Sequence, residues 1–112
     1  MPKSLRTFIQ DCQRELPGEV IHITKEVNPA NYDVTAIIKH LGAQKKFPII
    51  IFDKPLNLNG KVGPIKLTMN CEISQGKAQI ALGMPKSSTR PEMAEKCLEM
   101  EEHRIPPTIV DK

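Results

Sequence analysis

The chain has 112 residues, of which 39% are hydrophobic and 26% are charged, and this balance places it among single-domain globular proteins. The sequence contains no Trp and one Tyr, so the aromatic side chains that stack on nucleic-acid bases are scarce. A formal net charge of +3 is too small to identify a partner.

The N-terminal part of the chain predicts a helix followed by a strand. Ser4 is suited to cap a helix, because apolar residues recur at helical spacing from Leu5 to Leu16. The dipeptide Pro17-Gly18 ends this pattern. The next run, Val20–Thr24, is rich in β-branched residues and predicts a strand.

The following part predicts another helix and another strand. Asn28-Pro29 is expected to form a turn, after which Asn31 or Asp33 caps a helix that Gly42 ends. The apolar run Phe47–Phe52 has no polar interruption, which predicts a strand buried on both faces.

The stretch from Pro64 to Gly83 predicts a strand, a sharp corner and a helix, around which the other elements pack. A short apolar run, Ile65–Met69, supplies the strand. Asn70 stands at the corner, where its side chain is expected to hold the turn by a hydrogen bond. Gly83 is placed where the helix would end in a left-handed turn.

The C-terminal part predicts a capped helix and an extended tail. Thr89-Arg90-Pro91-Glu92 fits a capping box with an early proline, so a helix is expected to begin there. Prolines prevent a helix over Ile105–Val110, whose apolar side chains are expected to lie on another surface, its own or a partner's. The whole order predicts an α/β fold, with a small single domain of alternating helices and strands over residues 1–103 and an extended proline-rich tail over residues 104–112.

Few residues indicate chemistry. The three cysteines, Cys12, Cys71 and Cys97, form no CxxC pair, so reduced thiols in a cytoplasmic protein are expected. The three histidines share no metal-ligand spacing with them. The sequence also lacks the motifs of serine hydrolases, phosphate-binding loops and dinucleotide-binding folds. We therefore expect no active site on this chain, and an interaction surface has to carry its function.

Several short motifs occur in an order that is typical of one enzyme family. They are Ser4–Phe8, Val20–Ile23 followed by Glu26–Pro29, Ile49–Asp53, Asn70–Gly83 and Ile105–Val110. In this order they resemble the N-terminal α/β domain of the UbiD decarboxylase family, over nearly the whole chain. Within the stretch Asn70–Gly83, Gln75 and Lys77 replace the two arginines that are usual in the family, which weakens or alters any anion contact there.

The resemblance implies one part of a larger enzyme. The family combines this N-terminal domain with a central domain that binds prenylated FMN together with metal ions, and with a C-terminal oligomerisation domain. This chain resembles only the first, so the resemblance implies no catalytic, cofactor-binding or metal-binding residue on it. It implies instead a small non-catalytic subunit of a split decarboxylase or carboxylase acting on aromatic or α,β-unsaturated carboxylic acids. The large partner chain of this cytoplasmic hetero-oligomer would hold the prenylated FMN.

In that interpretation, the acidic end of the last helix and the tail are expected to dock on the large subunit. The expected contact residues are Glu99, Glu101, Glu102, Ile105, Pro106, Pro107, Ile109 and Val110. Negative charge at the C-terminal end of a helix is disfavoured by the helix dipole, so a basic neighbour would stabilise it.

Two other interpretations remain open. The chain could be a stand-alone regulatory or binding module, with specificity in the loop 53–63. It could also be a structural or nucleic-acid-associated α/β protein that uses Lys39, Lys45 and Lys46, for which a steep dependence of affinity on salt is expected. No membrane partner is expected, because the longest apolar run is far too short to span a bilayer.

Overall fold

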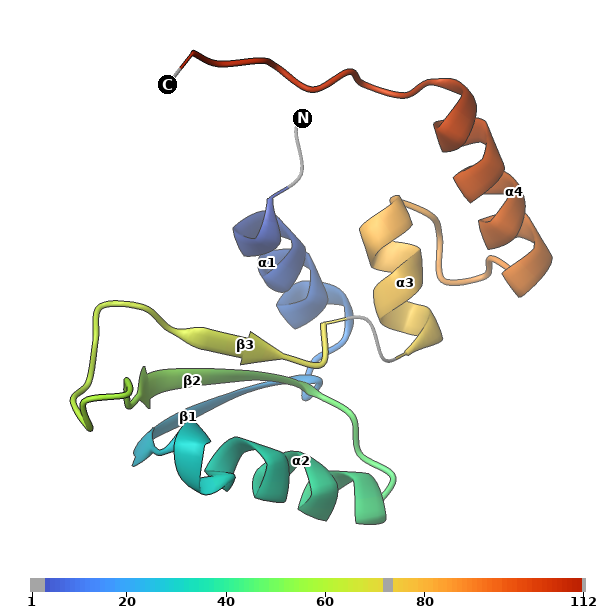
Figure 1. The fold of residues 1–112 in the computed structure, drawn as a ribbon. Helices are drawn as coiled ribbons and strands as arrows, with labels where there is room; N and C mark the ends of the chain where they lie inside the picture. The colour runs from blue at the N-terminus through green and yellow to red at the C-terminus, as the bar shows by residue number, and fades with distance from the viewer. Residues whose placement is uncertain (1–3, 72–73, 112) are drawn as a thin grey trace.

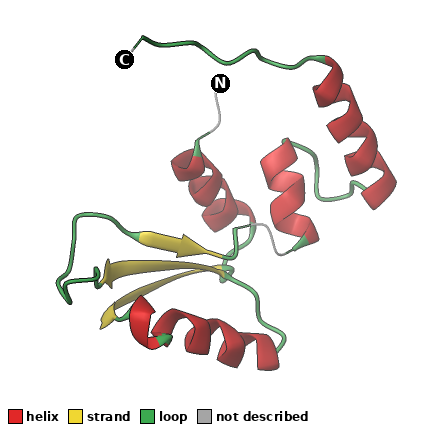
Figure 2. Cartoon of the chain, in the orientation of Figure 1, coloured by secondary structure: helices red, strands yellow, loops and turns green. Residues whose placement is uncertain are grey.

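A computed structural model describes residues 4–71 and 74–111 of the chain (Figure 1). In chain order, its elements are α1 (Leu5–Glu15), β1 (Val20–Val27), the short 3-10 helix η1 (Pro29–Asn31), α2 (Asp33–Ala43), β2 (Ile49–Pro55), β3 (Leu67–Met69), α3 (Gln75–Leu82) and α4 (Arg90–Glu102). Figure 2 shows these helices and strands mixed along one chain, which confirms the predicted α/β fold.

The sheet has the strand order β1-β2-β3, so β2 lies in its centre. β1 and β2 are parallel, with Val20 opposite Ile49, whereas β2 and β3 are antiparallel, with Ile51 opposite Thr68. Parallel strands need a crossover connection, which here contains α2. Figure 1 shows α2 on one face of the sheet and α1 and α3 on the other, so the domain has three layers.

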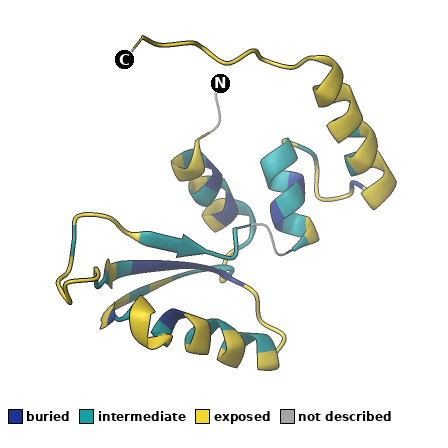
Figure 3. Cartoon of the chain, in the orientation of Figure 1, coloured by how far each residue is buried: buried dark blue, intermediate teal, exposed yellow. Residues whose placement is uncertain are grey.

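β2 is buried on both faces, as its uninterrupted apolar sequence predicts. Toward α1, Ile49 and Ile51 pack in a cluster with Cys12. Toward α2, Ile50 and Phe52 belong to a second cluster with residues of β1 and α2. Figure 3 shows the first part of this strand as a continuous buried stretch, Ile49–Phe52, and the two clusters together form the core.

Several predicted helix ends are confirmed by their hydrogen bonds. Ser4 caps α1, and Thr7 completes the cap, because Thr7 N donates to Ser4 Oγ (3.2 Å) and Ser4 N donates to Thr7 Oγ1 (2.9 Å). Thr89 caps α4 by accepting a hydrogen bond from Glu92 N (3.3 Å). Gly83 ends α3 with a φ of 69°, in the left-handed region that glycine tolerates.

The predicted bounds of α2 are wrong at both ends. Neither Asn31 nor Asp33 is its N-cap, which is Tyr32 at a φ of 61°. The reason is the preceding turn: the Asp33 carboxylate accepts a hydrogen bond from Asn28 N (2.7 Å) instead of capping the helix. At the other end, Gly42 lies inside the helix, which continues to Ala43.

The bounds of the strands also differ from the predicted ones. β1 continues past Thr24 to Val27, across a register irregularity between Ile23 and Glu26. β2 begins at Ile49, later than the predicted Phe47, and continues to Pro55, into the predicted loop. Most of the added residues are polar, so backbone pairing between the two strands keeps them extended where side-chain type gave no signal.

The strand and the helix on either side of Asn70 are present, and residues 72–73, the nearest partners for the expected side-chain hydrogen bond of Asn70, lie outside the described residues. β3 begins at Leu67, later than the predicted Ile65. Asn70 has a φ of 63°, and within residues 4–71 and 74–111 its side chain makes no hydrogen bond. Its backbone carbonyl accepts a hydrogen bond from Lys77 Nζ (3.2 Å). After the corner, Ser74 caps α3 by accepting from Lys77 N (3.3 Å).

The C-terminal helix and tail stand apart from the three layers. In Figure 1, α4 lies beyond α3, on the side away from the sheet, and the tail leads away from its end. Residue by residue, α4 has no buried side chain, and the described tail residues are all exposed (Figure 3). Among the helices of the described ranges, none is long and apolar enough to cross a membrane.

Candidate interaction surface

We define the C-terminal arm as α4 together with residues 103–111. Its helix is built by local signals, namely the Thr89 cap and a proline in the first turn. It touches the body of the domain mainly through α3, and only Met93 and Lys96 are half-buried. Most of the arm surface is therefore open to solvent.

The arm exposes apolar side chains that a folded chain normally buries. Ile105, Ile109 and Val110 are 93%, 91% and 77% exposed, and Leu98 of α4 is 67% exposed. Single exposed apolar residues are ordinary, but several along one projecting segment are typical of a surface that binds another molecule.

Acidic side chains accompany these apolar ones, and some of them are paired within the arm. Glu101 accepts hydrogen bonds from the guanidinium of Arg104, one of them from Nε at 2.9 Å. Lys96 Nζ lies 3.6 Å from a carboxylate oxygen of Glu99. Glu102 has no such cation among the described residues. These exposed pairs are weak. Because Glu99, Glu101 and Glu102 outnumber the two cations, the end of the arm keeps a net negative charge that suits a basic partner surface.

A shallow hollow of about 460 Å³ marks the junction of α4 and the tail. It is lined by Lys96, Glu99, Met100, His103, Arg104 and Ile105. The hollow combines the apolar side chains of Met100 and Ile105 with charged ones, a mixture that suits a side chain from another protein.

All the contact residues predicted from the sequence lie on the arm and are exposed. They are Glu99, Glu101, Glu102, Ile105, Pro106, Pro107, Ile109 and Val110. The structure brings Glu99 and Ile105 together at the hollow, whereas Ile109 and Val110 lie farther along the tail. Docking of these residues on a partner stays a prediction, since the structure contains a single chain.

Sequence reasoning missed the role of Lys77, which is fully buried. Its ammonium donates hydrogen bonds to the carbonyl oxygens of Phe47 and Asn70, and so ties the start of β2 to the end of β3. Burial lowers the pKa of the amine, with a smaller opposing effect from Glu19. A signal was present: Ile80 lies one helical turn after Lys77, on the face of α3 that packs on the core.

The cysteines show no reactive arrangement. Cys12 is fully buried, Cys71 half-buried and Cys97 exposed. Burial raises the pKa of the Cys12 thiol, although nearby Lys77 partly offsets this effect. Cys12 therefore stays protonated and serves as a small core residue.

The part of the chain that the structure describes contains no group of three or more His, Cys, Asp or Glu residues placed to hold a metal ion. In the comparisons with known proteins, no family model, curated protein or solved structure matches the chain. The UbiD resemblance thus depends on the sequence motifs alone.

Proposed function

We propose that this chain is the small, non-catalytic subunit of a split UbiD-like decarboxylase or carboxylase, and that the C-terminal arm docks it on a large flavin-binding subunit. The observation that carries the docking role is the arm itself, a helix without a buried side chain that continues into an exposed apolar tail. The identity of the partner rests on the ordered sequence motifs.

The chemistry of the arm defines the partner surface. An apolar groove flanked by Lys and Arg would bury Ile105 and Ile109 and neutralise Glu101 and Glu102 at the end of α4. In this proposal the large subunit binds prenylated FMN and its metal ions, since the family's positions for these groups lie beyond the part that the chain resembles. The reversible decarboxylation of aromatic or α,β-unsaturated acids takes place there, in the cytoplasm.

The test begins with the complex isolated from its native source. Intact-complex mass spectrometry should find a heavier chain bound to this one, and the same sample should show a flavin-like absorption band. Deleting residues 104–112 should then abolish co-purification of the flavin-binding chain. A colourless monomer or homo-oligomer would overturn the subunit proposal, and an equally tight complex without the tail would overturn the role of the arm.

A matched pair of variants separates the apolar contact from the rest of the arm. Ile105→Asp/Ile109→Asp should release the flavin-binding chain. Leu58→Asp/Val62→Asp introduces the same charges at exposed apolar residues of the loop between β2 and β3, and should leave the complex intact. Loss of the complex in both pairs would point to charge alone and contradict the assignment.

A further inference from the structure

A groove between α1 and the sheet lies far from the C-terminal arm in the chain and has no role in the proposed function. On the α1 face of the sheet, His22, Ile51 and Thr68 are cross-strand neighbours, one from each strand. Residues of α1 lie over this row. The resulting groove has a volume of about 440 Å³ and is lined by Leu5, Arg6, Ile9, Gln10, Gln13, His22, Ile51, Lys66 and Thr68.

The groove has an apolar floor. Ile51 is nearly fully buried and belongs to the core cluster on this face, against which Ile9 packs. Leu5, which the sequence places on the apolar stripe of α1, is 55% exposed at the edge of the groove. An apolar side chain left open beside a buried floor favours an occupant with an apolar body.

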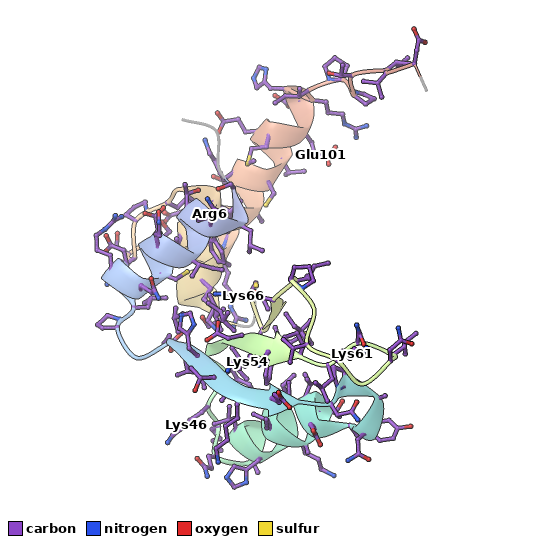
Figure 4. All side chains as sticks on the ribbon, turned by 90° about the vertical axis from the view of Figure 1, so that its left-hand side faces the viewer. Arg6, Lys46, Lys54, Lys61, Lys66 and Glu101 are labelled. Atoms are coloured by element: carbon purple, nitrogen blue, oxygen red, sulfur yellow. The ribbon has the colours of Figure 1, made fainter. Side chains whose placement is uncertain are left out.

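Two cations stand at the rim. Figure 4 shows Arg6 on α1 and Lys66 just before β3 on the same side of the molecule, and both line the groove. Within the described residues, Arg6 has no carboxylate partner. Arginine and lysine side chains that flank an apolar cavity select an anionic head group.

Lys66 forms an ion pair with the carboxylate of Asp53. Asp53 Oδ1, which is closed to solvent, lies 3.2 Å from Lys66 Nζ and 3.5 Å from His22 Nδ1. An ammonium group has three N–H donors, so the contact with Asp53 leaves Lys66 able to donate to a ligand. Asp53 neutralises the positive charge of Lys66, and Arg6 supplies a second positive charge at the groove.

We propose that this groove binds a small amphipathic monoanion, a carboxylate with an aliphatic or aromatic body. The carboxylate lies between Arg6 and Lys66, and the body lies on Ile9 and Ile51. This site does not depend on the arm or on a large subunit, so its test is independent of the test of the proposed function.

Four small probes test the proposal on the full chain, followed by backbone amide chemical shifts. Octanoate has both the body and the head group, acetate has only the head group, 1-octanol lacks the charge and octylammonium reverses it. Octanoate should shift the amides of Arg6, His22 and Thr68 in a saturable manner, and the other three should bind at least fivefold more weakly. Equal binding of octylammonium, or octanoate shifts centred on another part of the chain, would overturn the proposal.

Charge-matched variants provide a second test of the groove. Arg6→Gln/Lys66→Gln should weaken octanoate binding about tenfold, because two charge-assisted contacts at an exposed site are lost. Lys39→Gln/Lys61→Gln removes the same net charge from exposed residues outside the groove and should leave binding unchanged. Equal affinities in the two double variants would refute the site.

A third variant separates ligand binding from any effect that the loss of Lys66 has on Asp53. Arg6→Glu leaves the Asp53–Lys66 pair in place and should abolish octanoate binding while the amide spectrum stays that of the folded protein. Binding that survives this reversal of charge would also refute the site. Deletion of residues 104–112 should not change octanoate affinity.

Discussion

The side chain of Lys77 joins two separate strands of the sheet. Its Nζ donates to the carbonyl oxygens of Phe47, just before β2, and Asn70, just after β3. Replacing it with Met keeps the aliphatic stem and removes both hydrogen bonds. Lys77→Met should lower the free energy of unfolding by about 1–3 kcal/mol, measured by urea denaturation. The exposed Lys61→Met should change it by less than about 0.5 kcal/mol.

The same lysine gives a pH dependence whose sign follows from its burial. Its pKa is lowered in the folded protein, so between that value and the ordinary 10.5 the unfolded chain binds more protons than the folded one. The free energy of unfolding should therefore rise with pH through this window, relative to Lys77→Met. Urea denaturation of both proteins from neutral to alkaline pH measures the difference. A difference that does not change with pH would contradict a buried, charged Lys77.

Asp53 supplies a second residue-scale prediction. Lys66 lowers the pKa of its carboxyl below 3.8, burial opposes this effect, and His22 lowers the pKa further. Lys66→Gln removes the first of these effects, so the pKa of Asp53 should rise. A carboxyl-carbon NMR titration of Asp53 measures the change directly, and an unchanged titration would show that the pair does not form in solution. Because the folded pKa is depressed, this pair stabilises the fold above that pKa and is lost as the pH falls through it.

At the scale of elements, the end of α3 depends on one backbone conformation. Gly83 adopts a φ of 69°, and a Cβ there would cost about 1–2 kcal/mol. Gly83→Ala should lower the free energy of unfolding by that amount, measured by urea denaturation. Gly63 is the matched control, since it has open space around a would-be Cβ and no positive φ. A similar loss of stability in both variants would mean that the positive φ of Gly83 is not the cause of the loss.

Elements with local signals could be predicted from the sequence, and elements set by distant contacts could not. Ser4, Gly83 and Thr89 act within a few residues of themselves, so the helix ends they mark are recognisable in a linear pattern. The start of α2 is an exception, because its contact is local: Asp33 bonds back to Asn28 N instead of capping the helix. Polar strand residues such as Glu26 carry no strand signal of their own, and Glu26 pairs with Lys54 of β2, which is distant in sequence.

The candidate sites divide in the same way. The arm was predictable, because prolines and exposed apolar residues follow one another in sequence. The groove was not, since His22, Ile51 and Thr68 come together only when three strands align. Lys77 is intermediate: its helical spacing to Ile80 was visible, but its two carbonyl partners belong to the ends of other elements.

At the scale of the whole molecule, the arm changes the overall dimensions. The radius of gyration over Cα atoms is 16.9 Å, whereas a compact chain of this length has about 13 Å. Small-angle X-ray scattering of the isolated chain should give the larger value. A radius close to that of a compact chain would show that the arm folds back on its own body, and would remove the main support for docking on a partner.

The position of β2 has a consequence for how the protein opens. Its backbone pairs with β1 on one side and β3 on the other, and both of its faces are covered. Each of its amide protons is bonded to one neighbouring strand and lies between two covered faces, so exchange requires that pairing to break and the core around it to open. Their deuterium exchange should therefore report an event close to global unfolding. Amides of α4, which has no buried side chain, should exchange far earlier by local fraying. The chain would then carry its least protected segment at the surface offered to a partner, where binding itself would slow the exchange.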